Sequence, residues 1–204
     1  MIKKYNMNEK IKKIAIIALF SAISAVLMYI DFPLPIAPSF MKMDLSEIPV
    51  IVGGFILGPI ECVIIAILKV LIKFVLKGTS TMFIGEIANM IGSISYALPA
   101  SIIYKKLKTK KRAIIGLILG TILSSIICTV CNALFLFPFY INVFNMSEEV
   151  IIKMCSAILP FIDSMNEVYI CSVFPFNLVK FTITSIITYI FYKSISKTVK
   201  NILK

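Results

Sequence analysis

The sequence predicts an all-α integral membrane protein: a six-helix bundle in a single domain, residues 1–204, with both termini in the cytoplasm. Hydrophobic residues make up 59% of the chain and its mean hydropathy is +0.99, far above the composition of soluble domains. Charge-free stretches at 14–30, 87–104 and 113–147 approach or exceed the ~20 apolar residues that a helix needs to cross a bilayer. A multi-pass membrane protein is therefore expected.

The positive charges predict the topology. Of 21 Lys and Arg residues, fifteen lie within 3–13, 105–112 and 193–204. Short basic segments beside membrane spans stay in the cytoplasm, so these three segments anchor the bundle on that side. Anionic lipid headgroups are a secondary attraction for them. The net charge of +11 therefore indicates membrane anchoring and no nucleic-acid partner.

Hydropathy and charge together place each element in order. We expect a helix at about 12–30, a proline-rich loop at 31–46, a helix from Glu47 to Gly58, a helix through Lys69 and Lys73 to Lys77, a helix at about 82–104, a helix at about 113–137, an external connection from Pro138 with a short helix around 148–158, and a last helix from Phe174 onward. The first helix is expected to be retained, because no small-residue cleavage site follows Ile30. No internal repeat is evident, which argues against inverted-repeat transporters.

Polar side chains recur at one depth of this bundle. At ~1.5 Å of rise per residue, amide and ammonium groups on four helices fall within the outer ~12 Å of the membrane: Lys69 and Lys73, Asn89, Asn132, and Asn177 with Lys180. Lysines this deep in hydrocarbon indicate a functional site or a buried ion pair. The pattern predicts an outward-facing pocket with several donors, few negative charges and apolar walls, suited to a flat amphipathic small molecule.

Each polar residue also has a simpler interpretation. Asn89 and Asn132 could serve as interhelical hydrogen-bond partners, and Lys73 and Lys77 could extend their ammonium groups to the interface. Glu86 is the expected partner of the deep lysines. On the first helix, Ala18 and Ala22, with Ser21 and Ala25, form small-xxx-small pairs that serve internal packing or dock another membrane subunit.

Histidine is absent from the chain, and the carboxylates are isolated in sequence, which argues against an intramembrane enzyme or a metal site. Cys128 and Cys131 have redox spacing but lie within a predicted span, so small core residues are the favoured interpretation. Cys155 and Cys171 fall in the external region, where a disulfide is an alternative that the sequence does not favour.

Several strings resemble one family: "FPLPIAPSFMKMDLSEIPVIVGGFILGP", Lys69, "GTSTMFIGEIAN", Asn132 followed by "LFLFP", and "FPFNLVK". They are similar to the riboflavin-specific S components of bacterial energy-coupling factor (ECF) transporters, in order and over nearly the whole chain. The resemblance implies a riboflavin-binding protein of the bacterial cell membrane that acts with a transmembrane coupling subunit and two ATPase subunits. No G-x-x-x-x-G-K-[ST] motif occurs, so ATP hydrolysis is left to those partners.

The resemblance also implies roles for individual residues. Asn132, Asn177 and Lys180 would hydrogen-bond the flavin, with Asn89 and Lys69 nearby. Leu34, Pro35 and Phe40 would cover the ring as part of a lid, Ser46 and Glu47 would open the second helix, and Ala18 and Ala22 would contact the coupling subunit. Riboflavin is the transported ligand, and no cofactor is expected.

The chain departs from the family pattern at Val70, where asparagine is frequent, at Phe181, which replaces a usual glycine, and in a longer connection between the last two helices. Two alternatives within the membrane class stay open: an S component for another vitamin, and a structural scaffold without a ligand.

Overall fold

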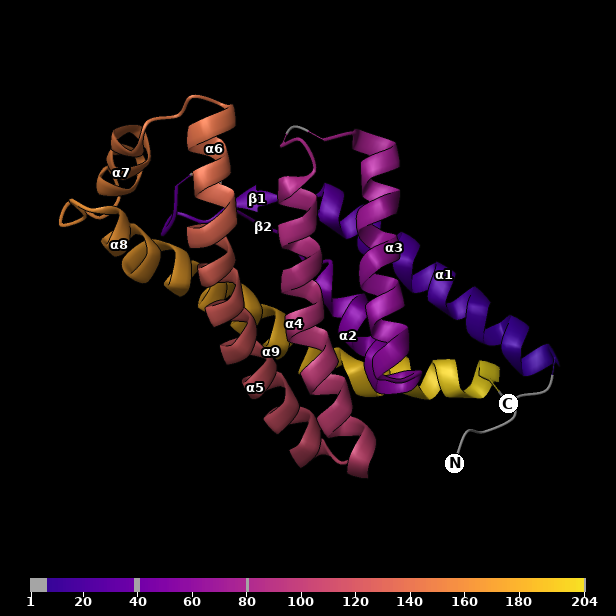
Figure 1. Cartoon of the computed structure of the whole chain (residues 1–204). Helices are drawn as coiled ribbons and strands as arrows, with labels where there is room; N and C mark the ends of the chain where they lie inside the picture. Colours follow the sequence, from indigo (N-terminus) through magenta and orange to yellow (C-terminus); the bar gives the residue numbers. More distant parts are fainter. Residues whose placement is uncertain (1–6, 39–40, 80, 204) are drawn as a thin grey trace.

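The protein is a helical bundle in which helices occupy all six predicted ranges (Figure 1). The computed structural model describes residues 7–38, 41–79 and 81–203, and omits the side chains of residue 194 and residues 196–203. Its elements are α1 (Met7–Tyr29), β1 (Phe32–Pro33), β2 (Lys42–Met43), α2 (Glu47–Ile56), α3 (Pro59–Lys77), α4 (Ile84–Leu107), α5 (Lys110–Cys131), α6 (Phe137–Val143), α7 (Glu148–Ser156), α8 (Met165–Glu167) and α9 (Phe174–Leu203). Two π-helical segments, Asn132–Leu136 and Val168–Val173, join α5 to α6 and α8 to α9.

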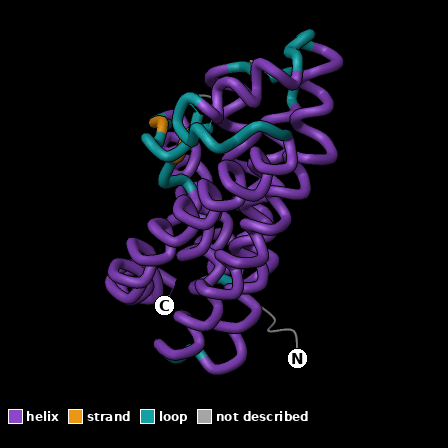
Figure 2. Tube along the Cα trace, turned by 90° about the vertical axis from the view of Figure 1, so that its left-hand side faces the viewer, coloured by secondary structure: helices purple, strands orange, loops and turns teal. Residues whose placement is uncertain are grey.

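Loops and chain ends separate to opposite ends of the bundle. Figure 2 shows most loops and both short strands at one end, with the start of α1, the α4–α5 turn and the end of α9 toward the other. The strands β1 and β2 pair antiparallel and close the first loop into a short ribbon. The elements that carry the three basic segments thus share one end of the molecule.

Four helical stretches in the described part of the chain are long and apolar enough to cross a membrane: Met7–Tyr29, Ile84–Leu107, Lys110–Val143 and Met165–Lys193. The helix α2 has ten residues, which span ~15 Å, about half of a bilayer core. The helix α3 carries a glutamate and three lysines within its nineteen residues. An all-α membrane fold is therefore confirmed, while six full crossings and the cytoplasmic position of the termini stay predictions.

The expected end of one helix was wrong. The fifth helical stretch was expected to stop at Phe137, but helix continues to Val143. The last α-helix begins at Phe174 as expected, and α8 with the second π-helical segment extends that helical stretch back to Met165. Proline inside an α-helix clashes with the carbonyl four residues earlier. At both sites a π-helical turn precedes the proline, with N–H bonds from Phe137 to Asn132 and from Phe174 to Tyr169. This wider turn lets the helix pass through "FPF" twice. The short helix predicted around 148–158 is present as α7.

Two apolar clusters form the interior. The larger joins α1 to α5 with α9 and includes a stacked pair, Phe55 and Tyr104, whose ring centroids are 4.4 Å apart. The smaller lies among the first loop, α6, α7, the second π-helical segment and the start of α9, around Phe137, Ile151 and Val168. The polar side chains of the predicted site lie between these two clusters.

Close packing of α4 on α5 depends on two glycines spaced four residues apart. A Cβ atom at Gly116 would lie 2.8 Å from the Ala100 carbonyl oxygen, and one at Gly120 would lie 2.6 Å from that of Tyr96. Both neighbours are backbone atoms, so neither can yield by turning a side chain. The helices approach this closely only because both positions lack a side chain.

We expect Gly120→Ala to destabilise the protein by about 1–3 kcal/mol, because the added methyl group forces α4 and α5 apart. Unfolding in detergent, followed by circular dichroism, measures the change. Ala15→Val, which adds methyl groups at an exposed position of α1, is the matched control and should leave stability unchanged. Equal stability of Gly120→Ala and the control would contradict the packing role.

Candidate binding site

A cavity of about 930 Å³ lies between the two apolar clusters, toward the end of the bundle where the loops gather. It falls within the ~300–1,000 Å³ range of small-molecule sites. Its walls come from the first loop, from α1 to α7 with the first π-helical segment, and from α9. Phe137, Tyr140, Phe176 and Phe181 provide aromatic surface.

The structure brings five of the predicted site residues to this cavity. Asn89, Asn132, Asn177, Lys180 and Glu47 all line it, from α4, the start of the first π-helical segment, α9 and the start of α2. Asn89, Asn132, Asn177 and Lys180, which the depth argument placed at one level, thus line the same cavity, and their contact with a ligand stays a prediction.

The expectation of few negative charges was wrong. Four carboxylates line the cavity beside four lysines: Asp31, Asp44, Glu47 and Glu86, with Lys42, Lys73, Lys77 and Lys180. Sequence spacing alone did not indicate that the first loop folds its acids inward. The lining is balanced in charge, so it suits a ligand without net charge.

Lys69 lies behind the cavity wall rather than in it. Its side chain is fully buried, and its Nζ donates to Glu47 Oε1 at 2.6 Å and to Ser46 Oγ at 2.8 Å. Ser93 Oγ donates to the same glutamate oxygen at 2.7 Å. The prediction that Lys69 marks a buried ion pair is confirmed, but its expected partner Glu86 was wrong. The start of α2 places Glu47 beside Lys69, whereas Glu86 pairs with Lys73.

Lys180 also pairs with a carboxylate other than Glu86. Its Nζ lies 3.4 Å from Asp44 Oδ2, and both side chains are buried. The other Asp44 oxygen accepts the Ser46 backbone N–H at 2.8 Å. Burial alone would raise the pKa of Asp44, yet Lys180, Lys69 and the bonds from Ser46 lower that pKa to about 2. Asp44 is therefore a carboxylate at neutral pH.

The two helical asparagines share one geometry. Asn132 Nδ2 donates to the Cys128 carbonyl at 2.7 Å, and Asn177 Nδ2 donates to the Val173 carbonyl at 2.9 Å. Each bond orients the amide and uses one of its hydrogens. Within the described residues, neither amide has a further partner, so its oxygen and its second hydrogen are available to a ligand.

Two buried oxygen atoms at the cavity lack hydrogen bonds. Glu47 Oε2 and Asn89 Oδ1 have no partner among the residues that the structure describes. A buried acceptor left unsatisfied costs roughly 1–3 kcal/mol. Both atoms therefore favour a ligand that donates hydrogen bonds.

Glu86 organises the rim of the cavity. Its Oε2 accepts from Thr79 Oγ1 and Thr81 Oγ1, each at 3.0 Å, and its Oε1 lies 3.5 Å from Lys73 Nζ. Lys77 lies 4.7 Å from the centre of the Tyr29 ring and 3.9 Å from Asp31. These contacts fix the α3–α4 loop beside the opening.

The first loop contributes less to the cavity lining than expected. Leu34 is half-buried against the smaller apolar cluster and Pro35 is exposed, and neither lines the cavity. Ser46 is buried behind Glu47, and Phe40 lies outside the described residues. Asp31, Met41, Lys42 and Asp44 are the described residues of this loop that line the cavity.

The cysteines and the departures from the family pattern also have definite positions. Cys128 packs against the larger apolar cluster, as expected, and both it and the half-buried Cys131 line the cavity. Cys155 is buried, and both it and Cys171 are free thiols. Val70 is buried away from the cavity, whereas Phe181 lines it with its ring 4.9 Å from that of Tyr96.

Sequence reasoning missed Asp44, Ser93 and the two threonines of the rim. Asp44 sits in a loop without periodicity, so its distance from Lys180 on α9 could not be counted. Its only signal was position, three residues before Glu47 in "MKMDLSE".

Ala18 and Ala22 of α1 lie on a different face from its buried small residues. Ser21, Ser24 and Ala25 are buried, and Ser24 Oγ donates to the Ser46 carbonyl at 3.0 Å. Ala18 and Ala22 lie on the exposed face of the helix. Internal packing thus explains one set of small residues, and the other is open to a partner.

The fold and the cavity define a multi-pass membrane protein with a cavity of small-molecule size near one end. Residues 12–192 match the family described as ECF transporter, substrate-specific component. The chain therefore belongs to this family of non-enzymatic transport subunits.

Relatives and a solved structure agree with this family. The chain is 28% identical over 200 residues to the riboflavin transporter RibU of Staphylococcus aureus (strain TCH60), covering 98% of each chain. It is 27% identical over 189 residues to the riboflavin transporter FmnP of Bacillus subtilis (strain 168), covering 90% of this chain and 92% of that one. A solved structure of the S component of a bacterial ECF transporter has a TM-score of 0.71 at 28% identity, covering 94% of this chain and 99% of that one.

We expect Lys69→Met to destabilise the protein by about 3–5 kcal/mol, because it leaves the Glu47 carboxylate buried without its cation. The double variant Lys69→Met/Glu47→Gln should recover much of this loss. Unfolding by denaturant in detergent measures both. A single variant as stable as the parent protein would show that the pair does not hold the floor of the cavity.

Proposed function

We propose that this chain is the riboflavin-binding S component of an ECF vitamin importer. The observation that carries the proposal is the charge-balanced, aromatic-walled cavity with two unsatisfied acceptors, Glu47 Oε2 and Asn89 Oδ1. Riboflavin has no net charge near neutral pH, a flat tricyclic ring and several hydroxyl and carbonyl groups. The names of the relatives from Staphylococcus aureus and Bacillus subtilis support the same ligand.

The lining offers complementary groups for such a ligand. The imide N–H and the ribityl hydroxyls of riboflavin would donate to Glu47 and Asn89. Its carbonyl oxygens would accept from Asn132, Asn177 or Lys180. The ring would lie against aromatic walls such as Phe137 and Phe176. Lys69 and Ser46 would act indirectly, by holding Glu47 in place, and the first loop with Leu34, Pro35 and Phe40 would close over the opening.

Transport requires partners and a fixed orientation. The chain would stand with its three basic segments in the cytoplasm and its cavity toward the outside. Two ATPase subunits would supply energy through a transmembrane coupling subunit. The exposed face of α1 around Ala18 and Ala22 would dock that subunit, because small residues let helix backbones approach closely.

Quenching of riboflavin fluorescence by the purified protein tests the ligand. Asn177→Ala should weaken binding about 3–10-fold, the value of one neutral hydrogen bond. Lys180→Met should weaken it about 10–100-fold, since a charge-assisted donor is lost and Asp44 loses its partner. A scaffold without a ligand would predict no change in either variant.

Asn142→Ala is the matched control. Its side chain makes the same bond to the carbonyl four residues earlier, at 2.7 Å from Pro138, but lies outside the cavity lining. This variant should keep full affinity. A colourless preparation that also fails to quench riboflavin would assign the cavity to another small molecule.

The double variant Ala18→Leu/Ala22→Leu should lose assembly with the coupling subunit and the ATPases while keeping riboflavin affinity. The larger side chains prevent close approach of a partner helix without touching the cavity. Co-purification from membranes that contain all subunits measures assembly. Ala157→Leu, at an exposed alanine beyond α7, should assemble normally. Intact assembly of the double variant would remove α1 as the docking helix.

A further inference from the structure

A second hollow, of about 420 Å³, lies along α4 and α5 on the outside of the bundle. Its walls are branched aliphatic side chains: Ile91, Ile94, Leu98 and Ile102 from α4, and Leu123 and Ile127 from α5. The hydroxyl of Ser95, which also borders it, is used internally, because it donates to the Gly92 carbonyl at 2.9 Å. We call this hollow the α4–α5 groove.

The α4–α5 groove follows from the glycine contact between the two helices. Gly116 and Gly120 hold the helix backbones together, so the larger side chains are displaced to the flank of the contact. Ile91, Leu98 and Ile102 share one face of α4, since their spacings of seven and four residues are whole turns. They form one wall, and Leu123 with Ile127 forms the other.

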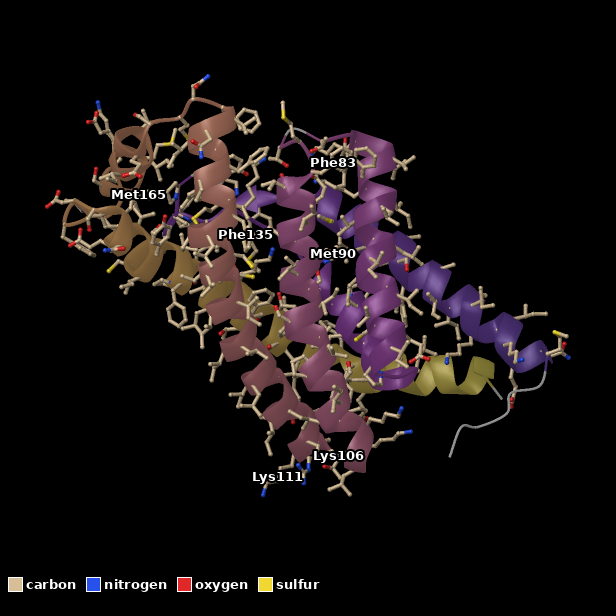
Figure 3. The ribbon with its side chains drawn as sticks, viewed as in Figure 1. Phe83, Met90, Lys106, Lys111, Phe135 and Met165 are labelled. Atoms are coloured by element: carbon tan, nitrogen blue, oxygen red, sulfur yellow. The ribbon has the colours of Figure 1, made fainter. Side chains whose placement is uncertain are left out.

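A dense group of positive charges lies at the end of this groove. Lys105, Lys106, Lys108, Lys110, Lys111 and Arg112 occupy the α4–α5 turn, and none of them makes an ion pair with any residue that the structure describes. No Asp or Glu occurs between Glu86 and Glu148. Figure 3 shows Lys106 and Lys111 at this turn, at the opposite end of the molecule from Phe83. The first-turn N–H groups of α5 add further donors there.

The groove and the basic turn are spaced like the parts of a phospholipid. Ile102 lies four residues before Lys106 and Ile91 lies fifteen before it, so the groove runs from ~6 Å to ~22 Å away from the lysine. One leaflet of the hydrocarbon core is ~15 Å deep. An acyl chain in the groove would therefore place its phosphate at the basic turn.

We propose that the α4–α5 groove and the basic turn form a binding site for one anionic phospholipid. Its phosphate lies against Lys106 and Lys111 with their neighbours, and one acyl chain fills the groove. A helix from another protein fits less well, because helix interfaces in membranes use small residues, and here those residues face inward between α4 and α5. The basic turn supplies the preference for negative charge, at about 1 kcal/mol for each nearby Lys or Arg. This site is independent of the riboflavin cavity.

Native mass spectrometry of the full chain, purified in a neutral detergent, tests the site with palmitoyl-oleoyl phosphatidylglycerol against palmitoyl-oleoyl phosphatidylcholine. We expect one phosphatidylglycerol molecule to bind at least about tenfold more tightly than phosphatidylcholine. The variant Lys106→Gln/Lys111→Gln should lose this preference. Lys10→Gln/Lys12→Gln, which removes the same charge from α1, should keep it.

The groove is tested separately from the charge. Ser95→Phe fills the groove. It should weaken the binding of palmitoyl-oleoyl phosphatidylglycerol but not that of dihexanoyl phosphatidylglycerol, whose chains are too short to occupy the groove. Ile102→Trp is the second variant if Ser95→Phe does not fold. Cooperative unfolding in phosphatidylcholine micelles, unchanged from the parent protein, verifies the fold of every variant.

Three results would overturn the proposal. Equal binding of the two headgroups would remove the phosphate site, and equal losses in the α1 control would reduce it to general attraction between charges. A dimer whose formation displaces the lipid and is blocked by Ser95→Phe would assign the groove to a second copy of the chain.

Discussion

The buried ion pair between Lys69 and Glu47 is the interaction on which the cavity depends. An ammonium group without exposure costs several kcal/mol in lost hydration unless its donors are used, and here they are used on the start of α2. Because the pair fixes Glu47 and Ser46, it also fixes the turn that presents Asp44 to Lys180. The floor of the cavity is thus one connected polar layer, and removing one partner of either ion pair would leave a buried charge behind.

The equal number of carboxylates and lysines in the cavity lining favours a ligand without net charge. Lys180, Lys73 and Lys77 each have a carboxylate within 4 Å, so none needs an anionic ligand. Glu47 Oε2 and Asn89 Oδ1, which have no partner in the described part of the chain, would instead accept hydrogen bonds from N–H or O–H groups of a ligand. A neutral molecule with several donors and a large apolar part answers both conditions, which is why the electrostatics and the proposed vitamin agree.

Helices with strong periodicity could be predicted from the sequence, and contacts made through loops could not. Asn89, Asn132, Asn177 and Lys180 met as expected because their depth follows from the fixed rise of a helix. Asp44 was missed, and Glu86 was given the wrong partners, because the path of the first loop between α1 and α2 is set by tertiary contacts and not by a repeat.

The continuation of helix past two prolines was missed for a related reason. A proline after an apolar run normally ends a helix, yet Pro138 and Pro175 each follow a π-helical turn that only the folded structure stabilises. Asn132 and Asn177 lie at or just beyond these turns, so the irregularity that defeated the boundary prediction also positions two cavity amides.

The helix α1 has an inner surface that contacts the cavity floor and an outer surface that is exposed. On its inner side, the hydroxyl of Ser24 holds the Ser46 carbonyl, directly beside the glutamate of the cavity floor. On its outer side, the same helix exposes Ala18 and Ala22. A movement of the floor that accompanies filling or emptying of the cavity would reach the back of that outer surface through this hydrogen bond and through the apolar packing of Phe20 against α2. The proposed coupling subunit would then respond to the loaded state without touching the ligand.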